Sequence, residues 1–160
     1  MADGGVSFDL RQLDAVSNNV LSVAALTDDK RSKLLKSIGV EMEAQTTERF
    51  DTKTDPQGNK WKDIADTTKS YYNAMLDSGK TDGKPRPPLV FTGDLRMSVT
   101  SEVQGGGWSV IVGAAKEYAN VHQYGFEAKN IPARPFIGIS AENQREIEEI
   151  IRAYLRRMFK

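Results

Sequence analysis

The chain has 160 residues, 39% of them hydrophobic and 28% charged, and its 22 basic and 22 acidic side chains balance. This length suits one domain with its own core, so we expect a single domain over residues 1–160. Zero net charge gives no overall field toward nucleic acid or anionic lipid. The lack of cysteine excludes disulfides and thiolate sites. Without a signal-peptide pattern or a long apolar stretch, we expect a cytoplasmic protein with no membrane contact.

Two helices are predicted in the first third of the chain. The first starts at Ser7, a candidate N-cap, and its apolar residues are spaced for one face as far as Ala24. The second follows Thr27, another candidate cap, with two aspartates suited to the positive helix end and an apolar stripe that reaches Phe50. Gly39 should weaken its middle by about 1 kcal/mol relative to alanine.

A turn is predicted after the second helix, at residues 55–58. Proline presets φ there, and the glycine at its end can take positive φ. The segment superficially resembles a calcium loop that starts at Asp51. Its sixth position is Pro56, where glycine is needed, and its twelfth is Lys62, where a glutamate is needed, so a solvated turn is favoured.

A weaker helix and a long loop come next. Residues 66–76 favour a helix with Tyr72, Met75 and Leu76 pointing inward. Residues 77–88 combine glycine, proline and charge and can bury little, so we expect an exposed, mobile loop.

Two alternating runs around a triple glycine predict a β-hairpin. Residues 99–103 and 108–112 alternate apolar and polar side chains, with the strand period of two, and the glycines between them can turn the chain. Just before the hairpin, Thr92 is expected to cap a short helix with Leu95 packed inward.

Helices return after the hairpin. A short helix should end at Gly125, which suits the C′ position. A terminal helix should follow Ser140 as its cap, with glutamates early, arginines late and a favourable pair from Glu148 to Arg152. This order predicts an α+β fold, with N-terminal and C-terminal helices packed on a small, mainly antiparallel sheet that contains the central β-hairpin.

The chemistry of the chain points away from catalysis. His122 is the only histidine, and neither a GxSxG nor an HExxH motif is present. We expect His122 to pack or to form hydrogen bonds. We therefore expect no enzyme activity, no catalytic residue, no metal site, no cofactor and no small-molecule substrate.

Two groups of basic residues could contact phosphate. Lys84 and Arg86 lie in the long loop, and Arg152, Arg156 and Arg157 lie near the C-terminus. No aromatic residues suited to stacking accompany them, so solvated charge is the favoured interpretation.

Five segments in this order resemble the phage virion morphogenesis family, also called the tail completion family. The combination of TGDLR, YANVHQYG and IPARPF is the most specific part of the resemblance. The five segments are the helix end and turn at 49–61, LVFTGDLRMSV at 89–99, VIVG at 110–113, YANVHQYG at 118–125 and IPARPFIGIS at 131–140.

The resemblance implies a structural protein of a tailed phage or prophage that acts late in virion morphogenesis. Such a protein completes the tail or the stable head–tail joint, at the neck or the head-proximal tail end. We expect a homo-oligomeric ring in contact with other phage head, neck or tail proteins, located in the virion and, during assembly, in the host cytoplasm. The alternative is a DNA-associated module that binds through the C-terminal arginines, which salt-dependent binding to duplex DNA would reveal.

An interface is expected around the proline-rich segment 131–136. Prolines hold it extended and reduce the entropy lost on docking. Arg134 can make a forked contact with a carboxylate or with backbone carbonyls. Phe136 is either an anchor in a partner or part of the chain's own core, and both interpretations stay open. The residues predicted at the partner or oligomer interface are Arg134, Phe136, His122, Tyr124, Trp61, Lys84 and Arg86.

Overall fold

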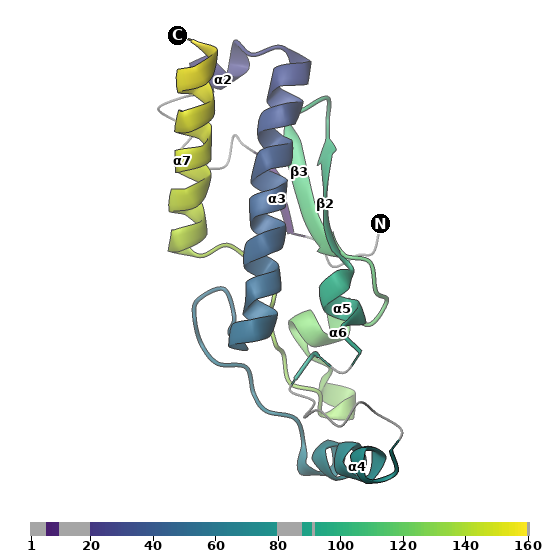
Figure 1. Cartoon of the computed structure of the whole chain (residues 1–160). Helices are drawn as coiled ribbons and strands as arrows, with labels where there is room; N and C mark the ends of the chain where they lie inside the picture. The colour runs from purple at the N-terminus through teal and green to yellow at the C-terminus, as the bar shows by residue number, and fades with distance from the viewer. Residues whose placement is uncertain (1–5, 10–19, 80–87, 91, 160) are drawn as a thin grey trace.

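The structure, a computed structural model, describes residues 6–9, 20–79, 88–90 and 92–159 (Figure 1). The predicted α+β fold is confirmed: helices from both ends of the chain pack on a small antiparallel sheet that contains the hairpin. The strands are β1 (Val6–Asp9), β2 (Val99–Gln104) and β3 (Ser109–Ala114). The helices are α2 (Val20–Ala24), α3 (Asp28–Thr52), α4 (Asp66–Asp77), α5 (Asp94–Met97), α6 (Ala119–Tyr124), the 3-10 helix η2 (Glu127–Lys129) and α7 (Ala141–Met158).

The sheet has the order β1-β3-β2, and both pairs of neighbours are antiparallel. The predicted hairpin is confirmed, with Val103 opposite Val110 and Ser101 opposite Val112. Val110 and Val112 are fully buried, so one face of β3 belongs to the core. The three glycines that join the strands all have positive φ, which explains why glycine occupies this turn.

The helix predicted from Ser7 is wrong at its start. Val6–Asp9 forms strand β1, which pairs with β3, and helix α2 begins only at Val20. Residues 10–19 lie outside the described part of the chain. The sequence VSFD alternates apolar and polar residues with the strand period of two. Pairing with β3 therefore outweighs the helical spacing of the apolar residues that follow.

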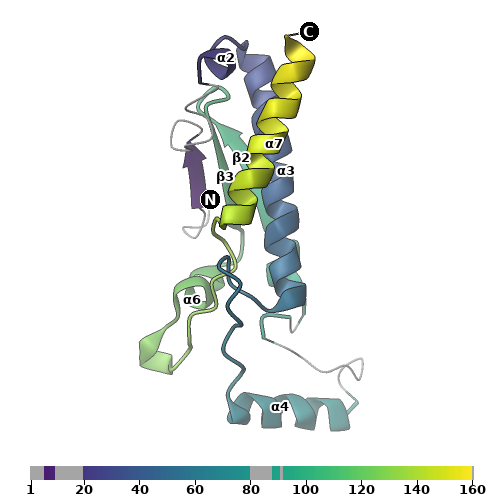
Figure 2. The same ribbon diagram turned by 90° about the vertical axis from the view of Figure 1, so that its left-hand side faces the viewer.

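Helices α3 and α7 run antiparallel and cover one face of the sheet (Figures 1 and 2). Gly39 lies where α3 crosses the sheet, and a Cβ there would meet the Ser101 side chain and approach Val110 Cγ2 to 3.0 Å. The close helix–sheet contact therefore requires glycine despite its cost in helix propensity. The main core lies between these layers and comprises Val23, Leu26, Leu34, Leu35, Ile38, Met42, Val110, Val112, Ile147, Ile151, Tyr154 and Leu155.

The caps of the two long helices differ. Ser140 caps α7 as predicted: its Oγ accepts from the Asn143 amide at 3.0 Å, and Asn143 Oδ1 accepts from the Ser140 amide at 2.8 Å. This reciprocal pair is a capping box. Thr27 occupies the N-cap position of α3, but its side chain makes no capping hydrogen bond. The predicted pair of Glu148 and Arg152 is confirmed at 3.2 Å.

The turn after α3 and the short helix α5 lie where the sequence predicts them. In the turn at 55–58, Gly58 has a φ of 85° and its amide donates to the Asp55 carbonyl at 3.0 Å. The Asp55 carboxylate accepts from the amides of Gln57 and Asn59 at 2.9 and 2.8 Å, so it organises this turn from within. Thr92 Oγ1 accepts from the Asp94 amide at 3.3 Å, although Gly93 rather than Thr92 is the N-cap of α5.

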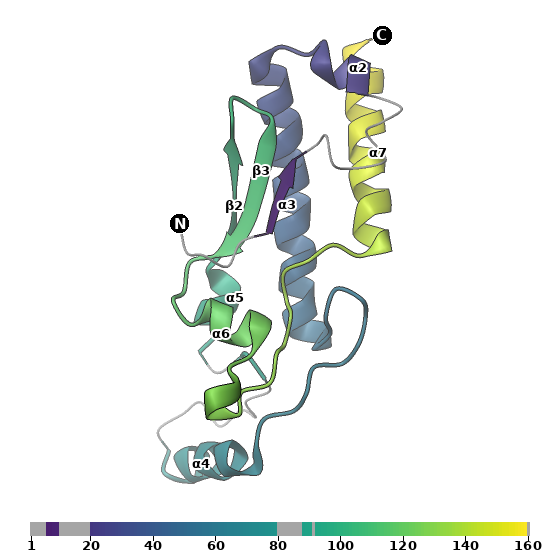
Figure 3. The ribbon, with the colours of Figure 1, turned by 180° about the vertical axis from the view of Figure 1, so that it is seen from behind.

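Helix α4 stands apart from the two long helices (Figures 1 and 3). The predicted helix is confirmed, but no residue of α4 is fully buried, and Tyr72, Met75 and Leu76 are only half-buried. Most of the predicted mobile loop, residues 80–87, lies outside the description. No described helix is long and apolar enough to cross a bilayer.

Candidate functional site

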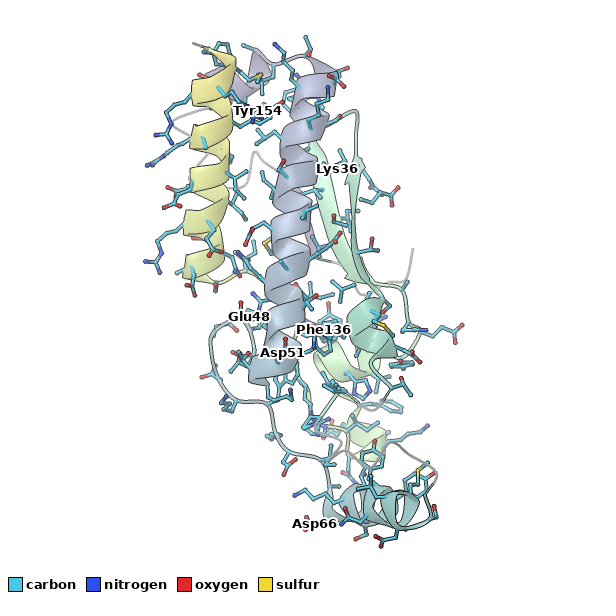
Figure 4. All side chains as sticks on the ribbon, viewed as in Figure 1. Lys36, Glu48, Asp51, Asp66, Phe136 and Tyr154 are labelled. Carbon is cyan, nitrogen blue, oxygen red and sulfur yellow. The ribbon has the colours of Figure 1, made fainter. Side chains whose placement is uncertain are left out.

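The proline-rich segment after η2 packs into a second hydrophobic cluster at the lower end of α3. Phe136 has no exposed surface, and its ring lies 5.3 Å from that of Phe50. Trp61 meets Phe50 edge-on, with ring centroids 5.6 Å apart. Figure 4 shows Phe136 at the junction between α3 and α5. The cluster comprises Phe50, Trp61, Leu95, Ala114, Ala119, Phe136 and Ile137.

Arg49 joins this segment to both long helices. From α3, its Nη1 donates to the carbonyls of Phe136 and Gly138 at 2.9 and 3.0 Å, and its Nη2 donates to Asn143 Oδ1 at 2.6 Å. Burial lowers the pKa of the guanidinium, while Asp55 and Glu48 favour its charged form. Arg49 therefore fixes the path of the segment that leads into α7.

Gln123 holds the same segment from α6. Its Oε1 accepts from the amides of Phe136 and Ile137 at 3.0 and 3.1 Å, and its Nε2 donates to the Ile137 carbonyl at 2.8 Å. Trp61 Nε1 donates to the Pro135 carbonyl at 2.8 Å. A segment without regular secondary structure thus has its buried backbone groups paired by side chains.

Arg134 makes its fork within its own chain. Its Nε donates to the Lys62 carbonyl at 2.7 Å and its Nη2 to the Asp63 carbonyl at 2.8 Å, which is the backbone alternative of the sequence prediction. Burial lowers the pKa of Arg134, and Asp63 opposes that effect. The side chain ties the linker before α4 to the proline-rich segment.

The residues predicted at an interface therefore occupy different environments. Phe136, Arg134 and Trp61 are buried in their own chain, so Phe136 follows the core interpretation in this conformation. His122 is half-buried, and Tyr124 is 66% exposed. Lys84 and Arg86 lie outside the described residues.

His122 lines a cavity of about 870 Å³ between the linker before α4, α5 and α6. Its ring meets Tyr118 edge-on at 5.9 Å, and its Nδ1 is buried without a hydrogen-bond partner. Asp94 and Arg134 also line the cavity. Among the described residues, no serine or carboxylate is hydrogen-bonded to this imidazole, and no group of acids and histidine is placed to hold a metal ion.

A His122→Gln variant should lose the pH dependence of stability near neutrality. Burial, with Arg134 nearby, lowers the pKa of His122 below its ordinary 6.5. The unfolded chain then binds more protons in this window, so stability falls as pH drops through 6.5 and below. Urea unfolding of both proteins between about pH 5 and 8 tests this, because the chain has no other histidine. Equal slopes for the two proteins would contradict it.

Five exposed apolar side chains lie on or next to α4, α5 and α6, and these three helices lie at the same end of the molecule (Figure 1). Exposed fractions range from 41% for Phe126 to 74% for Met97. We call this set the aromatic end: Tyr71, Met97, Tyr118, Tyr124 and Phe126. Sequence analysis identified Tyr124 alone. Helical spacing placed Tyr72 inward and so left Tyr71 on the outer side, but spacing alone does not identify an exposed tyrosine as a contact residue.

Comparison with known proteins agrees with the resemblance seen in the sequence. The profile of the phage virion morphogenesis family matches residues 9–156. Two Haemophilus influenzae proteins, Mu-like prophage FluMu G protein 1 and G protein 2, are each 30% identical, over 77% and 81% of this chain and 77% and 82% of their own lengths. "Putative capsid assembly protein G" of Escherichia phage Mu is 29% identical over 68% of this chain and 69% of its own. No solved structure matches significantly. The chain belongs to the phage virion morphogenesis family.

Proposed function

We propose that the chain is a non-enzymatic structural protein that completes the tail or stabilises the head–tail joint. It forms a ring of identical copies at the neck or the head-proximal tail end, in contact with other phage proteins. Membership of a virion morphogenesis family supports an assembly role. The name of the phage Mu relative refers to capsid assembly, which also fits such a role.

The observation that carries this proposal is the aromatic end. Large apolar side chains that stay exposed together are typical of protein–protein contact surfaces. Tyrosine is enriched among the residues that dominate binding energy, because its ring is apolar and its hydroxyl forms hydrogen bonds. Tyr118 is the N-cap of α6 and Tyr124 is its last residue. The Arg134 amide donates to the His122 carbonyl at 2.7 Å, and Gln123 Nε2 donates to the Ile137 carbonyl at 2.8 Å, so α6 is fixed to the proline-rich segment. The tyrosines are thus presented on a firmly anchored element.

Replacing Tyr71 and Tyr124 by serine should weaken association with partner copies or neighbouring phage proteins by about tenfold or more. Both side chains are more than half exposed, so the stability of the isolated chain should change little. Native mass measurements, and incorporation into particles of a phage that lacks the wild-type gene, would measure the loss.

Phe159→Ser is the matched control, because Phe159 is 58% exposed but lies at the opposite end of the molecule. It removes one exposed ring close in sequence to Arg156 and Arg157, so it measures how the loss of exposed apolar surface affects the stability of the isolated chain. Unchanged association, or full incorporation of the tyrosine variant into particles, would contradict a role for the aromatic end.

A further inference from the structure

Acidic side chains predominate at one end of the seam between α3 and α7 and basic ones at the other, although Arg145 lies at the acidic end and Asp28 and Asp29 lie at the basic end. The helices run antiparallel, so the first half of α3 lies beside the second half of α7 (Figure 1). Figure 4 shows Lys36 in the upper half of α3 and Glu48 near its lower end. We call Glu41, Glu48, Glu142, Glu146 and Glu149 the acidic pole, and Lys30, Lys33, Arg156 and Arg157 the basic pole.

The acidic pole brings like charges together. Burial raises the pKa of Glu146, and so do the carboxylates of Glu41, Glu142, Glu48 and Glu149 around it. None of these five carboxylates forms an ion pair within the described part of the chain. A hollow of about 640 Å³, lined partly by Glu48, Glu142 and Glu146, lies beside them. The hollow is large enough for incoming side chains.

The basic pole likewise combines side chains from α3 and α7. The Tyr154 hydroxyl of α7 donates to the Lys30 carbonyl of α3 at 2.9 Å, which places the two helices side by side at this end. Lys33 pairs with Asp29 at 2.7 Å, and the Arg157 guanidinium lies 5.4 Å from the Tyr154 ring. Lys30 and Arg156 are exposed and form no ion pair with any described residue.

The two poles cannot neutralise each other within one chain. Lys33 and Glu48 are separated by about 22 Å along α3 at the helical rise per residue. This distance exceeds the Debye length of about 8 Å at physiological salt. Between the poles, Val40 is 55% exposed, and the small residues Ala44 and Ala153 are exposed as well. The seam is therefore a surface with an apolar centre and oppositely charged ends.

The helix dipole explains only half of this arrangement. In α7 the glutamates precede the arginines, as the dipole favours. In α3 the order is reversed after the first turn, since Lys30 and Lys33 precede Glu41 and Glu48. Gathering like charges at one end is unfavourable for the isolated chain. The arrangement is consequently better explained by a partner than by the stability of the fold.

We propose that the acidic pole of one copy receives the basic pole of a second copy, head to tail along the seam. This inference rests on the proposed homo-oligomer and adds the seam to the aromatic end as a second contact surface between its copies. The chain's zero net charge allows copies to approach without overall repulsion, while their poles attract. Duplex DNA is a less favourable partner for the basic pole than a second copy, because the carboxylates on the same seam would repel the DNA phosphates.

Charge reversal at exposed positions tests the inference. Glu48→Lys with Glu149→Lys removes most of the negative charge of the acidic pole, and Lys30→Glu with Arg156→Glu cancels the positive charge of the basic pole. Each double variant should associate with itself at least about tenfold more weakly than the wild type in sedimentation velocity. A mixture of the two should recover association, because the unchanged acidic pole of one variant can receive the unchanged basic pole of the other. Wild-type association should also weaken between about 0.05 and 0.5 M NaCl.

The matched control for Glu48→Lys alone is Glu102→Lys, which changes net charge equally at an exposed position of β2, away from both the seam and the aromatic end. It should associate like the wild type. If association changes with neither charge reversal nor salt concentration, the pairing of the poles is contradicted, while the proposed oligomer is not. A wild type that stays monomeric at all salt concentrations would overturn both. Salt-dependent binding to duplex DNA that is lost on basic-pole reversal, with self-association unchanged, would overturn the inference in favour of DNA.

Discussion

A Phe136→Ala variant should lose about 3–5 kcal/mol of its free energy of unfolding. The ring of Phe136 is fully buried against Phe50, in a cluster that Trp61 closes from the other side. Removing it leaves a cavity that the surrounding backbone cannot readily fill, since Arg49 and Gln123 hold that backbone by hydrogen bonds. Urea unfolding followed by circular dichroism measures the loss.

Phe159→Ala is the control, because it removes the same ring from a position that is 58% exposed. We expect its stability to change by about 0.5 kcal/mol or less. The opposite pattern would contradict the core assignment: a Phe136→Ala chain with normal stability and helicity but no association. That result would mean that Phe136 leaves its own core to enter a neighbouring subunit.

Elements whose sequence periodicity agrees with their tertiary environment could be predicted. Helix α3 and helix α7 carry long apolar stripes with cap residues at their starts, and the hairpin alternates around three glycines. Strand β1 was missed, because the strand-like alternation of VSFD is short and is followed by helical spacing. It has four residues, and its state depends on the edge of β3, more than a hundred residues later in the chain. A local pattern contains no information about that pairing.

At the candidate site, too, the sequence predicted the local backbone conformation but not the tertiary contacts. Two prolines and a cap residue correctly indicated an extended segment that leads into the last helix. The direction of Phe136 stayed open, because a stiff extended segment suits a core and an interface equally well. Arg49 and Gln123 were not singled out in the sequence, although each lies in a segment that carries the family resemblance, 49–61 and 118–125. Their importance follows only from which carbonyl and amide groups the fold leaves unpaired beside them.

Arg49→Met should lower the free energy of unfolding by about 2–5 kcal/mol. Methionine keeps a similar apolar length but removes the donors to the Phe136 and Gly138 carbonyls and to Asn143. Burying a charge has a cost of its own, which methionine relieves in part. We expect the unpaired carbonyls to outweigh that relief, because the Phe136 carbonyl bond is buried and water cannot readily replace the guanidinium.

Arg49→Lys separates charge from geometry. An ammonium keeps the charge but cannot reproduce a planar fork with two donating nitrogens, so we expect most of the loss to remain. Arg156→Met, at an exposed position, should change stability by less than about 0.5 kcal/mol. Full stability of Arg49→Lys would show that positive charge alone is sufficient at this junction.

The fork of Arg49 links α3 to the segment that enters α7. Loss of the fork should therefore also loosen the second hydrophobic cluster, around Phe136, relative to the main core. Hydrogen exchange of the Phe136 and Ile137 amides should then rise before that of the β3 amides.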